Sequence, residues 1–198
     1  MPQPAIPGVD PGRLASITAE PRRYGFHGTL KAPFRLVGSR TREDLVAALV
    51  RFARRRVPFD APPLILGTLR EFLCLVPAQS DKAVQRLAEA CVMELDLFRA
   101  PPDDTRRATR ERRSLSAAQR ALLDRWGYAY VMEEFRFHLT LTDRLDPEER
   151  ETVRAGLAPL VESFSQERLR IDSLCLFEQA ERDAPFRLTV RFPFEGRG

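Results

Sequence analysis

The sequence predicts an α+β fold built from a duplicated unit, and three observations support this prediction. The pattern His-x-Thr-Leu occurs twice, each time after a phenylalanine and inside a strand-like run. Each copy is followed by a helical pattern and then by further strand-like runs, in the same order. Two apolar runs of similar composition, 72–76 and 173–177, stand at corresponding places. We therefore expect each half to form a strand, a helix and two more strands.

The first half begins with an extended arm and continues with alternating elements. Residues 2–19 are rich in Pro and are expected to have little regular structure, and a strand is predicted over 24–36. Thr41 with Asp44 three residues later resembles a capping box and predicts a helix that ends near Arg56. The other elements expected in this half are strands over 64–69 and 71–77 and a helix over 80–97.

The second half repeats this order after a connection over about 99–133. The connection holds a Pro- and Arg-rich stretch and a short helix over 116–126, which Gly127 closes. The other elements expected are a helix over 146–163, opened by Asp-Pro, and strands over 134–144, 167–172, 174–179 and 186–194. We expect one domain over 1–198 with two lobes, one at about 20–98 and the other at about 134–198.

Composition limits the classes to which the chain can belong. Its 198 residues, 43% hydrophobic and 30% charged, are typical of a globular domain with a real core. No apolar run is long enough to span a bilayer, and residues 1–12 lack the order of a signal peptide, so a cytoplasmic protein is expected. Three cysteines without a Cys-x-x-Cys pair indicate neither a disulfide framework nor a zinc site.

The positive charge is modest and unevenly placed. The formal net charge is +4, and a basic run over 106–113 interrupts a pattern in which most arginines stand among acidic residues. Such a field suits a substrate that carries phosphate, and it falls short of what a nucleic-acid-binding surface requires. The run itself is read either as a solvated loop or as a binding patch.

The two histidines are placed for acid and base chemistry. In a strand, alternate side chains share a face, so His27, Thr29 and Lys31 are expected on one face. In the second copy the corresponding face carries Arg136, His138, Thr140 and Thr142. A single motif of this kind is common on the solvent face of a strand, whereas two matched copies in a duplicated chain favour function. The duplication also predicts that the two histidines face each other across a cleft.

The pattern suits attack on a phosphodiester. One neutral imidazole would accept a proton from water, and the other, protonated, would donate a proton to the departing oxygen. The two Thr hydroxyls would hold phosphate oxygens, and Lys31 and Arg136 would stabilise developing charge, although Lys31 is equally well read as a surface lysine. Arg23 and Tyr24 are candidate contacts at the edge of the substrate. No metal site and no cofactor are expected.

These motifs resemble those of the two-histidine (2H) phosphoesterase superfamily. His27 with Thr29 and His138 with Thr140 match its two His-x-Thr/Ser motifs. The longer stretches 21–36, 134–142, 176–179 and 186–188 are similar to the 2H branch encoded beside bacterial phosphonate-degradation genes, and the likeness covers nearly the whole chain. The resemblance implies a bilobal fold in which two antiparallel sheets face a central cleft, with helices outside. It also implies a further strand before residue 1, so one sheet is expected to be a strand short.

The resemblance implies opening of a cyclic phosphate of a small ribose phosphate, such as 5-phosphoribosyl 1,2-cyclic phosphate. A symmetric pair does not reveal which histidine is the acid. Two other readings stay open: a 2′,3′-cyclic phosphodiesterase acting on RNA ends, and a binding module for phosphate or nucleotide without turnover. The expected partner is a small phosphorylated sugar or nucleotide, nucleic acid is a weaker expectation, and the chain is expected to be a monomer or a weak homo-oligomer.

Overall fold

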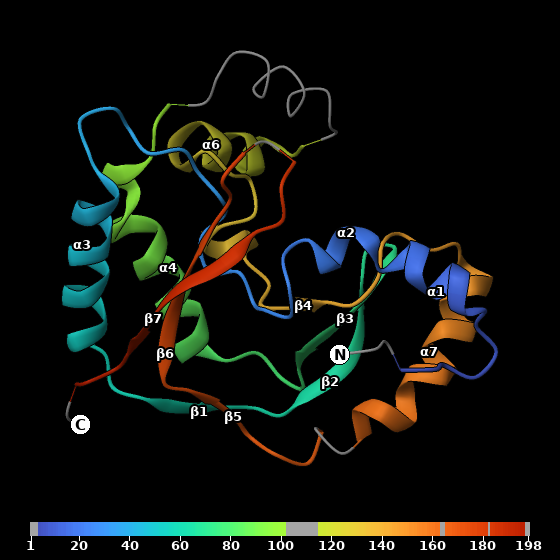
Figure 1. Ribbon diagram of the computed structural model, residues 1–198. Coiled ribbons are helices and arrows are strands. Elements are labelled where there is room, and N and C mark those ends of the chain that lie inside the picture. The colour runs from blue at the N-terminus through green and yellow to red at the C-terminus, as the bar shows by residue number, and fades with distance from the viewer. Residues whose placement is uncertain (1–3, 102–114, 163–164, 182, 197–198) are drawn as a thin grey trace.

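Small antiparallel sheets with helices packed on them form an α+β fold (Figure 1). The structure is a computed structural model and describes residues 4–101, 115–162, 165–181 and 183–196. The strands are β1 (Phe59–Ala61), β2 (Leu64–Leu69), β3 (Phe72–Pro77), β4 (Leu139–Thr140), β5 (Leu169–Ile171), β6 (Ser173–Glu178) and β7 (Arg187–Pro193). The α-helices are α1 (Pro11–Ile17), α2 (Ala19–Arg22), α3 (Arg42–Arg54), α4 (Lys82–Glu94), α6 (Ala117–Trp126) and α7 (Pro147–Glu162), and Asp96–Phe98 and Met132–Glu134 form 3-10 turns.

One group of elements is the three-stranded sheet β2–β3–β4 with α7 packed on it. β2 and β3 form a hairpin from Leu64 opposite Pro77 to Leu69 opposite Phe72. β4 joins the other edge of β3, with Thr140 opposite Cys74. The four buried side chains that hold strands and helix together are Leu64, Leu75, Leu139 and Val161. The second histidine motif therefore enters this sheet through β4.

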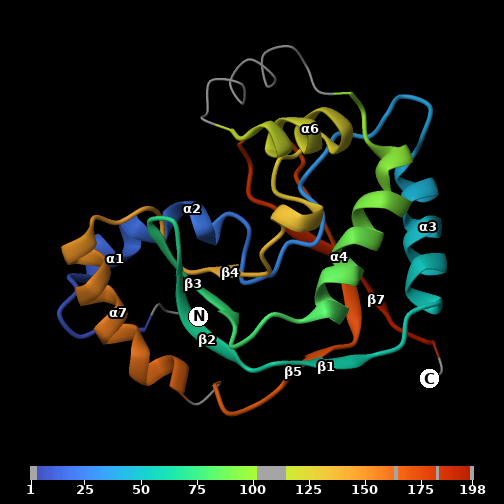
Figure 2. The same cartoon turned by 180° about the vertical axis from the view of Figure 1, so that it is seen from behind.

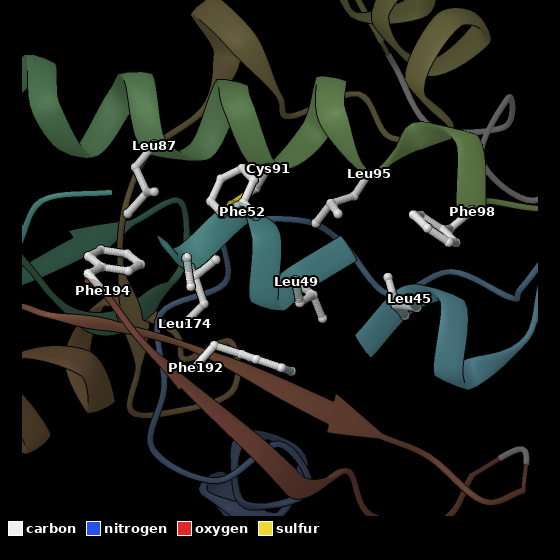
Figure 3. Packing of buried hydrophobic residues seen from close by; sticks show 11 residues of the cluster. Leu45, Leu49, Phe52, Leu87, Cys91, Leu95, Phe98, Leu174, Phe192 and Phe194 are labelled. Carbon is white, nitrogen blue, oxygen red and sulfur yellow. The ribbon is translucent and has the colours of Figure 1, made fainter. Parts of the chain in front are cut away.

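The other group is the two-stranded sheet β6–β7 with α3 and α4 (Figure 3). Leu45, Leu49 and Phe52 of α3 lie between α4 and the strands. Phe52 is only 1% exposed, which makes it one of the most completely buried side chains of the core. The side chains that meet α3 from α4, from the following turn and from the strands are Leu87, Cys91, Leu95, Phe98, Leu174, Phe192 and Phe194.

The two groups do not correspond to the two halves of the sequence. The β2–β3 hairpin of the first half packs with β4 and α7 of the second half, and the β6–β7 hairpin packs with α3 and α4 of the first half (Figure 2). β1 pairs with β5 and also joins the halves. Each hairpin buries its apolar face against a helix from the other half, so these two groups of elements differ from the contiguous lobes expected at 20–98 and 134–198.

The helix boundaries follow the capping residues. Thr41 and Asp44 form the capping box at the start of α3, as their spacing predicts. Ser116 caps α6, and Gly127 ends this helix in the left-handed conformation at φ +72°, which glycine adopts without strain. These predictions are confirmed because capping depends on residues only three or four apart.

The N-terminal region contradicts the expectation of an extended arm. Asp10 caps α1 by accepting a hydrogen bond from the N–H of Arg13, and Pro11 is the first helical residue. Leu14 and Ile17 are buried against Leu73 of β3 and Val153 of α7. The Asp-Pro pair that predicts α7 from Asp146 thus opens α1 as well, and apolar packing on α7 and β3 holds this short helix in place.

The strand expected over 24–36 is absent. Within the described residues, the ladder contact of this segment is an isolated bridge between Leu36 and Arg99. A cavity of about 810 Å³ lies between this segment and β6, and its wall includes Leu174 and Leu176. Because a strand is held by hydrogen bonds to a neighbouring strand, a segment that meets β6 through side chains such as His27 against Phe177 stays irregular. The strand expected over 134–144 is likewise reduced to Leu139–Thr140.

Two further observations concern expected features of the chain. The basic run over 106–113 and most of the Pro- and Arg-rich stretch lie outside the described residues. In the part of the chain that the structure describes, no helix has both the length and the apolar character needed to cross a bilayer.

Candidate functional site

The first histidine motif is fixed by local hydrogen bonds. Gly25 has φ +68°, which turns its carbonyl toward the His27 ring. His27 Nδ1 lies 3.0 Å from the carbonyl oxygen of Gly25, and His27 Nε2 lies 3.0 Å from the hydroxyl of Thr29. A carbonyl oxygen can only accept a hydrogen bond, so Nδ1 must carry a proton. In the neutral ring Nε2 is then the basic atom, and it accepts the Thr29 hydroxyl proton.

The second histidine motif has the same arrangement. His138 Nδ1 lies 2.7 Å from the carbonyl oxygen of Arg136, which is again the residue two positions earlier. By the same reasoning His138 presents Nε2 as the atom that gains or loses a proton. Both imidazoles thus have Nδ1 bound to a backbone carbonyl, and Nε2 of His27 also contacts the Thr29 hydroxyl.

Each imidazole also lies against a phenylalanine from the other half of the chain. The ring centroids of His27 and Phe177 are 5.3 Å apart, and those of His138 and Phe72 are 5.7 Å apart. Phe177 belongs to the β6–β7 hairpin and Phe72 to the β2–β3 hairpin. The exchange of hairpins between the halves therefore gives the two histidines matched surroundings.

The two motifs are in contact with each other. A Cβ atom placed on Gly28 would lie 2.5 Å from a ring carbon of Phe137. Gly28 stands between His27 and Thr29, and Phe137 directly precedes His138. Only glycine allows this close approach of the backbone to the ring. The contact brings together two segments that are more than a hundred residues apart in the sequence.

A cavity of about 240 Å³ opens where the motifs meet, and His27, Thr29 and Thr140 all lie in its wall. The remaining residues of the wall are Glu20, Pro21, Tyr24, Gly25 and Asp143. No lysine or arginine of the described part of the chain lies in this wall. The His138 ring lies outside this wall, against Phe72, two residues before Thr140. The structure thus brings three of the four motif side chains to one cavity, whereas the fourth, His138, lies against Phe72.

Lys31 does not point into this cavity. Its ammonium nitrogen lies 3.3 Å from the Asp96 carboxylate and 3.2 Å from the Val92 carbonyl, and its side chain is 10% exposed. Burial lowers the pKa of Lys31 from its ordinary value, although Asp96 opposes this effect. Lys31 therefore fastens the 24–36 segment to α4, and it lies with His27 and Thr29 in the wall of the cavity of about 810 Å³.

Arg136, Arg23 and Thr142 also have partners within the protein. The Arg136 guanidinium donates to the carbonyls of Glu133 and Phe135 and remains exposed. Arg23 donates to the Asp183 carbonyl and pairs with Glu20, which joins α2 to the turn before β7.

Thr142 is buried, with 2% of its surface exposed. Its hydroxyl oxygen accepts a hydrogen bond from the N–H of Leu73 and donates to the carbonyl of Asp143. The hydroxyl is thus engaged on both sides, and the expected role as a substrate contact is corrected to a structural role. Tyr24, in contrast, lies in the cavity wall and stacks on Phe186 with centroids 5.1 Å apart.

The sequence interpretation missed four residues of this region: Glu20, Asp143, Phe72 and Phe177. The two phenylalanines belong to apolar strand patterns and carry no signal that distinguishes them from core residues. Asp143 follows the second motif by three residues, so its proximity to the site was open to inference from spacing. Glu20 reaches the site only because α1 and α2 fold back on β3 and α7.

Comparison with known proteins gives a family and two relatives. The family described as "Protein of unknown function (DUF1045)" matches residues 29–187. A protein of Janthinobacterium sp. (strain Marseille) with the name "Ribose 1,5-bisphosphate phosphokinase PhnN" is 37% identical over 197 residues, which cover 98% of this chain and 44% of the relative. A protein of the same name from Laribacter hongkongensis (strain HLHK9) is 35% identical over 185 residues, 93% of this chain and 42% of the relative.

The chain thus spans less than half the length of the curated relatives it matches. No solved structure matches it. The family match includes Thr29, the whole second motif and the segments between them. By the extent of this match, the chain belongs to the DUF1045 family.

Proposed function

We propose that the chain is a metal-independent cyclic phosphodiesterase of the two-histidine type. The observation that carries the proposal is the matched pair of imidazoles, each bound through Nδ1 to the carbonyl two residues earlier. This arrangement leaves both Nε2 atoms for proton transfer, and the contact between Gly28 and Phe137 holds the motifs together. The substrate that we propose is a cyclic phosphate of a small ribose phosphate.

In the proposed reaction, a neutral imidazole accepts a proton from water through Nε2 as the water oxygen bonds to phosphorus. The ring P–O bond breaks, and the second imidazole, protonated at Nε2, donates its proton to the released sugar oxygen. In this reaction the Thr29 hydroxyl turns from His27 Nε2 to the phosphate, and Thr29 and Thr140 donate hydrogen bonds to the non-bridging oxygens, whose negative charge grows as phosphorus becomes pentacoordinate. The product is a ring-opened phosphate monoester, and each imidazole ends in the other's initial protonation state.

The size of the cavity favours a small substrate over an RNA end. Its volume of about 240 Å³ lies below the roughly 300–1,000 Å³ that is usual for drug-sized ligands. Among the described residues its wall has no cation for a polynucleotide backbone; Lys31, Arg35, Arg42 and Arg191 instead line the cavity of about 810 Å³, which shares His27 and Thr29 with it. The phosphonate-pathway branch of the two-histidine superfamily, which the motifs resemble, points to 5-phosphoribosyl 1,2-cyclic phosphate.

The name of the relatives raises a second candidate, phosphorylation of ribose 1,5-bisphosphate. A nucleotide-binding P-loop requires a lysine directly after glycine, and the two lysines of this chain follow Leu30 and Asp81. More than half of each relative lies outside the matched region. We infer that the kinase named in the relatives belongs to that other part and that this chain supplies a separate, phosphoesterase activity.

Phosphorus NMR tests the proposal directly. The purified chain is offered 5-phosphoribosyl 1,2-cyclic phosphate with EDTA, a 2′,3′-cyclic nucleotide with EDTA, and ribose 1,5-bisphosphate with ATP and Mg²⁺. We expect the first resonance alone to change to that of a monoester. If only the cyclic nucleotide is opened, the chain acts on RNA ends. If ATP is consumed, the chain is a kinase. If no sample changes, the chain is a binding module without turnover.

A further inference from the structure

Two carboxylates lie in the wall of the motif cavity, which the reaction above does not use. Asp143 and Glu20 border the same cavity as His27, Thr29 and Thr140. A negatively charged group beside a site for an anionic phosphate is unfavourable unless it binds another part of the ligand. The presence of these carboxylates therefore requires an explanation in terms of the substrate.

The position of Asp143 is set by three backbone contacts. Its N–H donates to the carbonyl of Ile17 at 2.6 Å, and its carbonyl accepts the hydroxyl of Thr142 at 2.9 Å. Its carboxylate accepts a hydrogen bond from the backbone N–H of Glu20. The side chain is thus held in the cavity wall with acceptor capacity to spare, because a carboxylate can accept about four hydrogen bonds.

The two carboxylates differ in their charge partners. Glu20 pairs with Arg23 at 3.2 Å, whereas none of the described lysines or arginines forms an ion pair with Asp143. Partial burial, together with the charge of Glu20, raises the pKa of Asp143 from its ordinary value. Asp143 is therefore the carboxylate whose charge the protein leaves unneutralised beside the site.

A sugar hydroxyl is the ligand group that fits such an acceptor. A hydroxyl donates a hydrogen bond without adding negative charge, and bonds to a charged acceptor are about twice as strong as neutral ones. A phosphate or a nucleobase carbonyl in the same place would meet repulsion. The phosphate must then lie toward His27 and the two threonines, with the sugar ring toward Asp143.

We propose that Asp143 is the specificity-determining residue that binds a free hydroxyl of the sugar ring, so that the site selects cyclic phosphates of polyols. This inference rests on the proposed phosphodiesterase function and names the substrate class of the same site. The backbone N–H of Glu20 donates a hydrogen bond to the Asp143 carboxylate and fixes its position. The carboxylate of Glu20 forms an ion pair with Arg23.

The test compares two substrates in each protein variant. One is a pentose 1,2-cyclic phosphate with a free 3-hydroxyl, and the other is its 3-deoxy counterpart. The measured quantity is the ratio of kcat/KM for the two substrates. Partial loss of folded protein lowers both values equally and leaves their ratio unchanged, so the test does not depend on the stability of the variant.

We expect the wild-type ratio to be about ten or more, as one charge-assisted hydrogen bond implies. Asp143→Ala should bring the ratio close to one, and Asp143→Asn, which keeps one acceptor oxygen, should give an intermediate value. Glu167→Ala, which removes an exposed carboxylate from the turn before β5, should keep the wild-type ratio.

Two results overturn the inference and are distinguishable from each other. A wild-type chain that opens both substrates, with the same ratio in Asp143→Ala as in wild type, overturns the role of Asp143 and leaves the phosphodiesterase in place. A wild-type chain that opens neither substrate overturns the proposed function and the inference with it.

Discussion

Gly28 lies against the ring of Phe137, and this contact joins the two His-x-Thr motifs. Each residue stands directly beside a motif histidine, so the backbone-to-ring approach brings the two motif segments together. The two motifs come into contact because the first has glycine at the position where the second has leucine.

Gly28→Ala should therefore disturb both stability and catalysis. The added methyl group would have to displace the Phe137 ring, which we expect to lower the free energy of unfolding by about 1–3 kcal/mol. The proposed activity should fall at the same time because the motifs move apart. Gly38→Ala is the matched control, since nothing lies within 4 Å of its added Cβ. Urea unfolding and the NMR assay measure the two effects, and equal behaviour of the two variants would contradict the account.

Replacement of Thr142 should lower the stability of the protein and leave its substrate affinity unchanged. Thr142→Val leaves the buried N–H of Leu73 without its acceptor and should cost about 1–3 kcal/mol of unfolding free energy. Thr142→Ser keeps the hydroxyl and should retain most of this stability. A large rise in KM for Thr142→Val, with no change in its urea midpoint, would restore the residue to the substrate site.

Thr29 should show the opposite behaviour. Its side chain is exposed and its hydroxyl contacts His27 Nε2 at 3.0 Å, so replacement disturbs the imidazole and not the core. We expect Thr29→Val to lower kcat/KM about tenfold, the size of one lost charge-assisted hydrogen bond, with an unchanged melting temperature. Thr29→Ser should stay near the wild-type rate, and a Ser variant as poor as the Val variant would argue against the hydroxyl.

The packing of the β6–β7 hairpin on α3 should make the free energy of unfolding depend on pH. Glu178 of β6 forms two hydrogen bonds with Arg42 at the start of α3, at 2.7 and 2.9 Å, and this contact lowers the pKa of Glu178. A lowered pKa gives stability that is fully present above the ordinary carboxyl pKa of 4.5 and is lost as the pH falls through the folded-state pKa.

Glu178→Gln should therefore lower the free energy of unfolding at pH 7, by less than about 1 kcal/mol because the pair is partly exposed. The difference from wild type should shrink as the pH falls below 4.5. Urea unfolding at a series of pH values measures it, with Glu167→Gln as the control for loss of an exposed acid. A difference that stays constant down to pH 3 would mean that Glu178 and Arg42 do not pair in solution.

The extent to which the fold followed from the sequence depends on the range of the interactions. The bounds of β2 and the capping box of α3 were predicted because they depend on neighbouring residues. The segment 24–36 has the alternation of a strand, but alternation does not supply the neighbour with which a strand must pair. The packing of each hairpin on helices from the other half could not be predicted either. The helices of both halves have an apolar face on which a hairpin can pack.

The same distinction holds for the candidate site. His27, Thr29, His138 and Thr140 were found through an internal repeat, which is a property of the sequence alone. Lys31 and Thr142 were placed on the site by strand alternation, yet their positions are decided by Asp96 and Leu73, far away in the sequence. Asp143 lacks a counterpart in the first copy, where Ala32 stands at that offset from the histidine, so the repeat gave no reason to select it.

The measurement that tests the central proposal most directly is the pH dependence of kcat/KM in wild type and in the two histidine variants. We expect a bell-shaped profile in wild type, which reports one protonated and one neutral group as macroscopic values of the pair. His27→Ala and His138→Ala should each lower kcat/KM by about 10²–10⁴-fold, and each residual profile should lack one limb of the bell. A wild-type rate in either single variant would contradict the two-histidine mechanism.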